Sequence, residues 1–280
     1  MGYYSEIPYI FTIHDLMHKY YREFPEIRFR DRVLRDIMFT RLTKRARLVL
    51  VDSRQGKEDA VRFYKVPPER ISILPTAPTQ EFFNKMDDDR INRLLEKFSL
   101  PDEYVYYPAQ FWVHKNHAAL LEAMKILQLK HHLRLSAVFT GSDKGALKSF
   151  LGKARELSLG EMVHYLGYVS EDEKVALYRR AKALVMPTFF GPANIPVWEA
   201  FASGCPVVAS DVHGTADQVG DAGLLFDPKD PEDLAEKLHT LLIDRQVREN
   251  IVKRGAERIK DLTPERHGRL VLDIINKAVI

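Results

Sequence analysis

The amino-acid sequence predicts a parallel α/β protein with one complete doubly wound domain preceded by part of a second. Three observations predict this class. Apolar, β-branched runs alternate with helix-like stretches along the chain. The runs are continuous rather than alternating in polarity, which is typical of strands buried on both faces of a parallel sheet. The composition, with 45% hydrophobic and 29% charged residues among 280, suits a chain that buries such cores.

The first part of the chain, residues 1–84, shows only three strand-like runs: "PYIFTIHD" (8–15), "ARLVLVDS" (46–53) and "ISILPTA" (71–77). Three strands are too few for an equal partner domain, and the series starts abruptly on a strand. We therefore expect the later part of a domain whose earlier strands are absent, an N-terminal truncation. An apolar sheet edge or face near residues 9–13 and 48–52 would then be uncovered and would favour self-association.

A basic segment lies within this first part. Between Lys19 and Arg47, inclusive, there are ten Lys or Arg and four Asp or Glu, and apolar residues recur at roughly helical spacing: Phe29, Val33, Ile37 and Leu42. One interpretation is an amphipathic helix packed on its own domain with a solvated basic face. The other is peripheral contact with an anionic membrane surface.

A charged segment, residues 85–100, is expected to be a linker to the second domain, residues 101–262. That domain has six strand-like runs: "EYVYYPAQ" (103–110), "LRLSAVFTGSD" (133–143), "MVHYLGYV" (162–169), "ALVMPTFF" (183–190), "CPVVAS" (205–210) and "AGLLFD" (222–227). Helix-like stretches separate the first four: "NHAALLEAMKILQLKHH" (116–132), "KSFLGKARELSL" (148–159) and "SEDEKVALYRRAK" (170–182). From Pro231 the pattern is helical, ending in a C-terminal helix over residues 263–280.

Charge and cysteine content narrow the function classes. The net charge is only +3, which argues against a general nucleic-acid binder. No apolar run reaches the roughly 18 residues of a transmembrane helix. Cys205 is the single cysteine, so an internal disulfide is excluded and a reducing, cytoplasmic setting is expected.

The stretch "MPTFFGPANIPVWEAFASGCPVVAS" (186–210) carries the clearest site pattern. Asn194 is a good N-cap, Pro196 suits the first helical turn, and Gly204 suits the position that ends the helix. A helix that follows a strand in a doubly wound sheet begins at the ligand-binding edge, where its free N–H groups attract phosphate. Glu199, one turn further in, would repel phosphate but could hold a neutral ribose diol. The alternative is a solvated first-turn acid that only stabilises the helix dipole.

This stretch resembles the signature of retaining glycosyltransferases of family 4, which have the two-Rossmann-domain fold called GT-B. Other segments are similar in order and spacing over nearly the whole chain, including "TIHDL", "HKNHAALLEA", "FTGSD", "YLGYVSEDEKVALYRRAKALVMPT" and "VGDAGLLFDPKDPEDLAEKL". The resemblance implies a donor domain from about residue 104 and, before it, an acceptor domain that lacks its first strands.

The resemblance also implies roles for single residues. Glu199 matches the second Glu of the family's Glu-x7-Glu pair, which holds the donor ribose, whereas the first Glu of that pair falls on Gly191. Lys115 matches the lysine that neutralises the donor diphosphate, and the usual arginine five residues earlier falls on Gln110. His14 matches the acceptor-domain histidine that faces the donor sugar. We expect His14, Lys115 and Glu199 to be the catalytic residues.

Backbone groups are expected to compensate for the missing side chains. We expect the main chain of Gly191, Pro192, Ala193, Asn194 and Ile195 to hold the donor, with N–H groups supplied by residues 193–195 and with Asn194 fixing the loop by capping the helix.

The remaining candidates have simpler interpretations. Gly141 ends a strand at the ligand edge and is expected to contact the substrate, as is Gln110. His114 and His117 have no further ligand at zinc-like spacing, so helix capping or a surface position is expected. The acidic triplet at residues 87–89 resembles the metal-binding motif of the other glycosyltransferase fold, but it flanks no strand and is expected to be solvated. No metal site is expected.

The predicted reaction is transfer of a sugar, with retention, from a nucleoside-diphosphate donor such as a GDP- or UDP-sugar to a hydroxyl of a glycan or lipid-linked saccharide. No other cofactor is expected. Two other readings remain open at this point. One is a weak or inactive relative that only binds nucleotide, because of Gly191 and Gln110. The other is a phosphate-recognising oxidoreductase, which the lack of a Gly-x-Gly-x-x-Gly motif after a strand disfavours. A place in the cytoplasm, peripheral to the inner face of the membrane, is the expected location.

Overall fold

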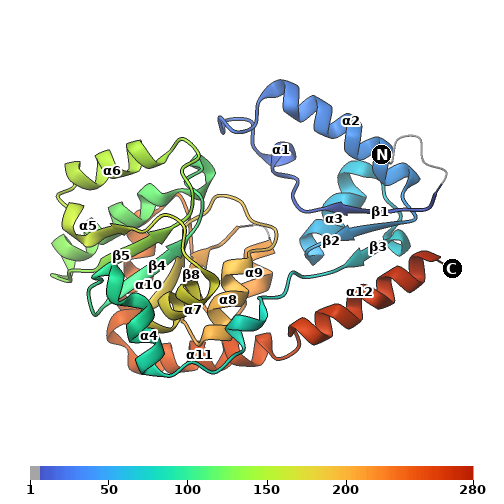
Figure 1. The fold of residues 1–280 in the computed structure, drawn as a ribbon. Helices are drawn as coiled ribbons and strands as arrows, with labels where there is room; N and C mark the ends of the chain where they lie inside the picture. The colour runs from blue at the N-terminus through green and yellow to red at the C-terminus, as the bar shows by residue number, and fades with distance from the viewer. Residues whose placement is uncertain (1–6, 213, 280) are drawn as a thin grey trace.

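The computed structural model describes residues 7–212 and 214–279 and shows two α/β units side by side (Figure 1). The smaller unit holds a three-stranded parallel sheet in the order β1-β2-β3, with β1 (Ile10–Ile13), β2 (Leu48–Val51) and β3 (Ile71–Ile73). The three strands predicted in the first part of the chain are confirmed. Their apolar, β-branched residues fit a sheet that is covered by helices.

The expectation of an uncovered apolar surface does not hold for β2, the central strand of this sheet. Leu48, Val49 and Val51 of β2 are buried, because β2 pairs with a strand on each side and its unit packs a small core against it. The expectation of exposed apolar surface near residues 48–52 is therefore wrong. β1 is an edge strand of the described sheet, and self-association through it stays a prediction.

The larger unit contains a six-stranded parallel sheet in the order β6-β5-β4-β7-β8-β9. Its strands are β4 (Tyr104–Pro108), β5 (Ser136–Thr140), β6 (Val163–Tyr165), β7 (Ala183–Met186), β8 (Val207–Ser210) and β9 (Leu224–Phe226). All six were predicted, and β4, β7 and β8 are almost entirely buried. Along the chain, β5 and β6 are added outward from β4 on one side of the sheet, and β8 and β9 are added outward from β7 on the other side. A crevice therefore forms between β4 and β7, where the two directions meet.

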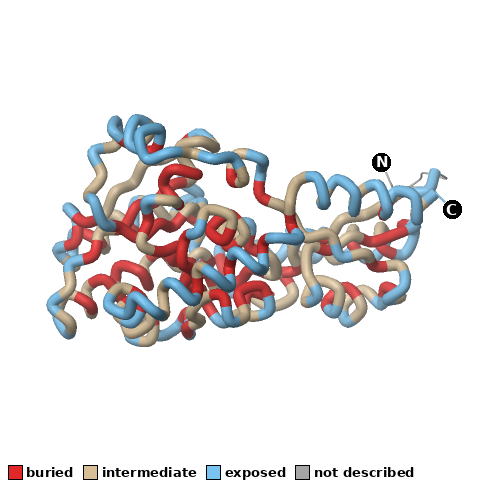
Figure 2. Tube along the Cα trace, turned by 90° about the horizontal axis from the view of Figure 1, so that it is seen from below, coloured by how far each residue is buried: buried red, intermediate tan, exposed pale blue. Residues whose placement is uncertain are grey.

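Helices cover both sheets. In the smaller unit these are α1 (Met17–Tyr20), α2 (Phe29–Arg45) and α3 (Arg54–Tyr64). The larger unit has α4 (Asp88–Leu95), α5 (His117–Lys130), α6 (Leu147–Glu156), α7 (Glu171–Arg180), α8 (Ile195–Ser203), α9 (Gly214–Val219), α10 (Pro231–Ile243) and α11 (Arg245–Ile259). The last helix, α12 (Pro264–Val279), runs back towards the smaller unit (Figure 1). Figure 2 shows buried segments in the interior of both units and exposed segments around them.

Side-chain caps fix where several helices begin. Ser170 and Glu173 form a reciprocal capping box at the start of α7. Asp230 accepts hydrogen bonds from two backbone N–H groups at the start of α10. Gly204 ends α8 in the left-handed conformation with φ of 68°, as its sequence position predicted.

Residues 85–100, which the sequence suggested as a linker, hold α4. Asp87 caps this helix by accepting the backbone N–H of Arg90 at 2.8 Å. Ile91 and Leu95 lie in the core of the larger unit. The acidic triplet at residues 87–89 therefore begins a packed helix, because carboxylates are favourable at a helix N-terminus.

The interpretation in which the apolar residues of α2 pack on their own domain does not match the structure. Phe29, Val33, Leu34 and Ile37 are exposed to solvent, with Phe29 72% exposed. Their spacing places them on the outward side of the helix. None of the helices in the described ranges is both long enough and apolar enough to cross a membrane.

Candidate functional site

A cavity of about 540 Å³ lies between the two units, within the size range of small-molecule sites. Apart from Arg35, which lies within α2, the lining segments follow the carboxyl ends of parallel strands or belong to the first turns of the helix after them, which is where ligands bind in such sheets. From the smaller unit the lining comprises His14, Asp15, Met17, Arg35, Asp52 and Thr76; from the larger unit it comprises His114, Lys115, residues 190–195 and Trp198.

Lys115 supplies a cation to this cavity. It ends the short 3₁₀ turn Val113–Lys115, just before α5. Burial lowers the pKa of Lys115 to about 8, although the charge of Asp15 acts to raise it. Within the described residues, Lys115 Nζ has no hydrogen bond or ion pair. A half-buried ammonium group without a partner gains most from an anionic ligand.

The smaller unit presents His14, Asp15 and Asp52 to the cavity. The His14 side chain is exposed, and its Nδ1 lies 3.4 Å from Asp52 Oδ2. Burial raises the pKa of Asp52, partly offset by His14. Burial also acts to raise the pKa of Asp15, but the hydrogen bond from the Arg35 guanidinium at 2.8 Å helps to hold it below its usual value.

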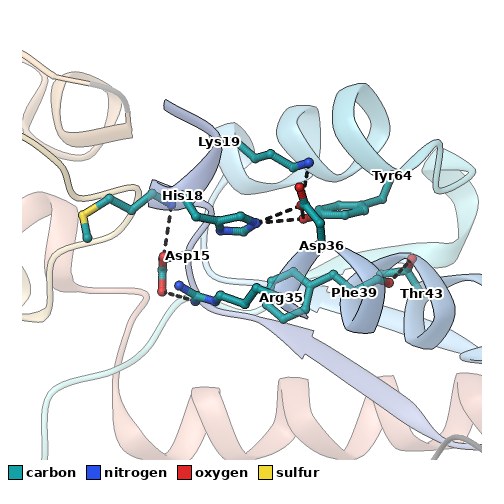
Figure 3. Close-up of polar contacts among 9 residues, drawn as sticks. Asp15, His18, Lys19, Arg35, Asp36, Phe39, Thr43 and Tyr64 are labelled. Carbon is teal, nitrogen blue, oxygen red and sulfur yellow. Dashed lines mark hydrogen bonds and ion pairs between the residues drawn. The ribbon is translucent and has the colours of Figure 1, made fainter. Parts of the chain in front are cut away.

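Figure 3 shows that Arg35 belongs to α2 and that the next residue, Asp36, contacts a second group of side chains. Asp36 Oδ1 accepts a hydrogen bond from Tyr64 at 2.8 Å and pairs with Lys19 at 2.5 Å. His18 Nε2 lies 3.1 Å from the same oxygen. These contacts anchor the inner face of α2 directly behind the cavity.

The loop from Gly191 to Ile195 is held from behind by α9. The backbone N–H of Asn194 donates to Gln218 Oε1 at 2.9 Å, and Gln218 Nε2 donates to the Asn194 carbonyl at 2.7 Å. The Asn194 side chain donates to Thr215 Oγ1 at 2.8 Å and to the Gly191 carbonyl at 3.2 Å.

These contacts correct two expectations about Asn194. It occupies the N-cap position of α8, but its side chain makes no capping hydrogen bond, because the amide is already engaged with the loop and α9. Its backbone N–H is likewise taken by Gln218. Elsewhere in the loop, Ala193 and Ile195 have backbone N–H groups with no partner among the described residues.

Two glycines allow this close packing. A Cβ atom added to Gly191 would lie 2.3 Å from Asn194 Oδ1. A Cβ atom added to Gly214 would lie 2.1 Å from the Pro192 carbonyl oxygen. The loop and the start of α9 therefore approach more closely than residues with side chains would permit.

Glu199 is buried rather than solvated. Its Oε1 accepts a hydrogen bond from Lys174 Nζ at 2.8 Å, and its Oε2 accepts one from Tyr178 at 2.9 Å. Both partners lie on α7. The interpretation of Glu199 as a solvated first-turn acid is therefore wrong. Glu199 is not among the residues that line the cavity, whereas its neighbour Trp198 is.

Two other predicted residues also lie outside the cavity lining. Gln110 is exposed, and its Oε1 accepts a hydrogen bond from Trp112 Nε1 at 2.9 Å. Gly141 joins two loops: its carbonyl accepts a hydrogen bond from Tyr165, and its φ of 130° requires glycine. A Cβ atom there would lie 2.5 Å from the Ala109 carbonyl oxygen. The structure thus places His14, Lys115 and residues 191–195 together, with Gln110, Gly141 and Glu199 around them.

The two histidines beside Lys115 are buried, contrary to the expectation of capping or surface positions. His114 Nδ1 lies 2.6 Å from Glu26 Oε1 of the smaller unit. Burial and the charge of Lys115 lower the pKa of His114, partly offset by Glu26. His117 stacks on Phe111 with ring centroids 4.1 Å apart. His114 lines the cavity, whereas His117 fills space beside it among aromatic rings.

Sequence reasoning missed several residues of this region. Asp15 and Asp52 directly follow strands at the ligand edge, a signal that could have found them. Arg35 and Trp198 lie on helices, and no local pattern marks them as cavity-lining. Lys174 and Tyr178, the two partners of Glu199, lie on a helix that is separated from Glu199 by a whole strand. Only the folded structure brings them to it.

The chain matches two family models. Residues 89–258 match the model described as glycosyl transferases group 1, and residues 3–77 match the model described as Glycosyltransferase Family 4. O-antigen chain mannosyltransferase B from Escherichia coli is 28% identical over 222 residues, covering 79% of this chain and 58% of that protein. A D-inositol 3-phosphate glycosyltransferase from Corynebacterium aurimucosum is 27% identical over 252 residues, covering 85% and 59%. The chain thus spans under two thirds of the length of either relative.

Solved structures share the fold. Sucrose-phosphate synthase from Thermosynechococcus elongatus superimposes with a TM-score of 0.82 at 23% identity, covering 99% of this chain and 69% of that one. Anabaena HepE, solved in complex with UDP and glucose, gives a TM-score of 0.81 at 17% identity, covering 96% and 71%. These likenesses establish the architecture that the sequence predicted.

Proposed function

Because this chain belongs to the group 1 glycosyl transferases and has the GT-B fold, we propose that it transfers a sugar from a nucleoside-diphosphate donor to a hydroxyl acceptor with retention of configuration. The observation that carries this proposal is the cavity between the units. It combines a half-buried lysine that has no partner among residues 7–212 and 214–279, a helix that begins at its wall, and a histidine from the opposite unit. The complex of HepE with UDP and glucose supports a nucleotide-sugar donor for a protein of this architecture.

The chemistry follows from these groups. The bond between the anomeric carbon and the diphosphate oxygen breaks through an oxocarbenium-like state, and the departing diphosphate gains negative charge. Lys115 and the N–H groups of Ala193 and Ile195 stabilise that charge. The acceptor oxygen attacks from the face that the leaving group vacates and gives its proton to the departing phosphate. Cationic and N–H groups serve the diphosphate here, so we propose that the reaction needs no metal.

The donor's other parts are assigned by position. His14 faces the loop at residues 191–195 across the cavity, and we assign it to the transferred sugar. Glu199 is assigned to the ribose. Lys174 and Tyr178 hold its carboxylate in place, and each oxygen can accept a further hydrogen bond. The acceptor is assigned as a glycan or lipid-linked saccharide, the class to which the O-antigen relative's name points.

The exposed face of α2 suggests where the protein would meet such an acceptor. This face combines Phe29, Val33 and Ile37 with the exposed basic residues Arg30 and Lys44. Apolar side chains flanked by cations favour the surface of an anionic membrane. We assign this helix to peripheral contact with the cytoplasmic face of a membrane.

The test measures release of nucleoside diphosphate from a panel of GDP- and UDP-sugars, with and without saccharide acceptors. The anomeric configuration of any product, read by NMR, tests retention. Equal activity with and without EDTA tests metal independence. Loss of turnover in Lys115→Met, with turnover kept in Lys148→Met on the exposed side of α6, is the expected result. No turnover of any donor by the unaltered chain would contradict the proposal.

A second function is favoured by one observation. Gly191 replaces the carboxylate expected to contact the donor sugar, and no side chain fits there beside Asn194. A chain that binds nucleotide without transferring sugar is therefore the alternative. It predicts nucleoside-diphosphate binding by calorimetry, unchanged by the sugar attached, and no turnover.

A further inference from the structure

Three side chains with metal-binding atoms meet on the outside of the larger unit. His131 caps the C-terminal end of α5, and Glu236 and His239 lie three residues apart on one face of α10. One ligand atom from each lies within 4.8 Å of the others. All three residues are half-buried. None lines the cavity between the units, so the proposed transferase function does not use them.

The two imidazole rings are stacked. Their centroids are 3.9 Å apart and their planes differ by 22°. His131 Nε2 lies 3.1 Å from Glu236 Oε1. Within the part of the chain that the structure describes, no hydrogen bond involves the ring nitrogens of His239.

We propose that His131, Glu236 and His239 bind a divalent transition-metal ion of the zinc class, with two imidazole nitrogens, one carboxylate oxygen and water completing the shell. Imidazole favours zinc, copper or nickel, whereas magnesium and calcium prefer oxygen ligands. Ligand atoms around a tetrahedral zinc lie about 3.3 Å apart. The three ligand atoms lie within 4.8 Å of one another, and modest rotation of these half-buried side chains brings them to that distance.

Lys130 is the competitor for this site. Its Nζ lies 2.7 Å from Glu236 Oε1 and 2.9 Å from Glu232 Oε1. The Lys130 side chain is 49% exposed and mobile enough to pair with Glu232 alone. A metal ion would therefore displace Lys130 from Glu236 and cross-link α5 to α10, two helices that pack against each other.

The experiment titrates Zn²⁺, Ni²⁺ and Mg²⁺ into untagged protein by calorimetry, since a polyhistidine tag would bind the same metals. One Zn²⁺ or Ni²⁺ per chain and no Mg²⁺ is the expected result. Co²⁺ should give visible d–d absorption bands from nitrogen and oxygen ligands. His131→Ala and His239→Ala should each weaken binding by at least about tenfold. His267→Ala, another half-buried helical histidine, should leave it unchanged.

Two further variants sharpen the test. Lys130→Gln removes the competing cation and should tighten Zn²⁺ binding by about tenfold, whereas Glu236→Gln should weaken it. Saturating Zn²⁺ should raise the melting temperature of the unaltered protein by about 5 °C and leave that of His239→Ala unchanged. Equal Zn²⁺ affinity in the unaltered protein and His239→Ala would overturn the proposal. Weaker binding in Lys130→Gln would also count against it.

Discussion

At the scale of single residues, Lys115 should make the binding of a diphosphate in the cavity depend on pH. Its pKa of about 8 means that the ammonium group is charged below that pH and loses its proton as the pH rises through it. A diphosphate binds the charged form. The dissociation constant of UDP or GDP should therefore rise by about tenfold per pH unit above about pH 8, until the pKa of the complex is reached.

Calorimetry at a series of pH values measures this effect, with the bare nucleoside as the control ligand. Lys115→Met should weaken diphosphate binding by about 1.5–3 kcal/mol and remove the pH dependence. Nucleoside affinity should change little in the same variant. Equal losses for nucleoside and nucleoside diphosphate would show that Lys115 does not touch phosphate.

Glu199 has a structural role besides the ribose-binding role that we propose for it, because it pairs with Lys174 and Tyr178 in the interior. Glu199→Ala leaves the buried Tyr178 hydroxyl with only its longer contact to the Pro196 carbonyl, at 3.3 Å, and should lower the free energy of unfolding by about 1–3 kcal/mol. Glu199→Gln keeps the shape and should cost less. Both should weaken nucleotide binding. Tyr178→Phe removes the hydroxyl that donates to Glu199 and to the Pro196 carbonyl but keeps the Lys174 pair, so its nucleotide affinity tests whether fixing Glu199 matters.

Urea unfolding measures the stability of these variants, and calorimetry measures their affinity. Unchanged nucleotide affinity in Glu199→Gln would remove the ribose assignment and leave Glu199 as a structural residue. The sequence could locate Glu199 but not its partners, because the helix that carries them is separated from it by a strand and a loop.

Gly191 is constrained by its neighbour. Because an added Cβ would lie 2.3 Å from Asn194 Oδ1, Gly191→Ala must displace a buried amide that holds the loop. It should lower stability by about 1–3 kcal/mol and weaken sugar-nucleotide binding. Gly152→Ala, in α6 where an added Cβ meets nothing within 4 Å, should instead raise stability slightly. Thermal unfolding of the two variants side by side checks this contrast; equal stability would contradict it.

At the scale of elements, the sequence predicted every strand because each is a short, continuous apolar run between turn residues. It could not predict which way α2 faces, since its apolar and basic residues fit either a packed or an exposed surface. The structure distinguishes these because Arg35 and Asp36 anchor the inner side of the helix. Likewise, the sequence did not predict α4, because half of its eight residues are charged and Ile91 and Leu95 are its only fully buried ones.

The exposed face of α2 leads to a test with vesicles. The Val33→Ser, Ile37→Ser double variant should reduce binding to anionic phospholipid vesicles by tenfold or more, since each buried side chain contributes about 1.5–3 kcal/mol. Binding to neutral phosphatidylcholine vesicles should be weak for both proteins. Ile243→Ser, at an exposed apolar position of α10, is the matched control. Unchanged sedimentation of the double variant with anionic vesicles would contradict the membrane assignment.

At the scale of the whole molecule, a short segment of the smaller unit holds the two units together. Glu26 pairs with His114, and Tyr21 donates to the Phe189 carbonyl at 2.8 Å. Phe24 stacks on Phe189 with centroids 5.8 Å apart. The sequence showed two units but not this junction, because its partners are 88 and 168 residues apart.

Breaking the Glu26 pair should loosen the arrangement. Glu26→Ala removes a buried acceptor from His114 and should increase the radius of gyration measured by small-angle X-ray scattering. Amide exchange near residues 20–26 should become faster. Glu23→Ala, an exposed acid in the same segment, should change neither. Identical scattering of the two variants would show that the pair does not set the distance between the units.

The support of the loop at residues 191–195 by α9 has a consequence for protein engineering. Residues 191–194 take their shape from Thr215, Gln218 and the bare backbone of Gly214. The two segments therefore form one structural unit that must be exchanged as a whole, although a strand and a helix separate them in the sequence. Grafting the loop of a relative alone should give an unstable hybrid, whereas transplanting both segments together should alter donor choice on an unchanged scaffold.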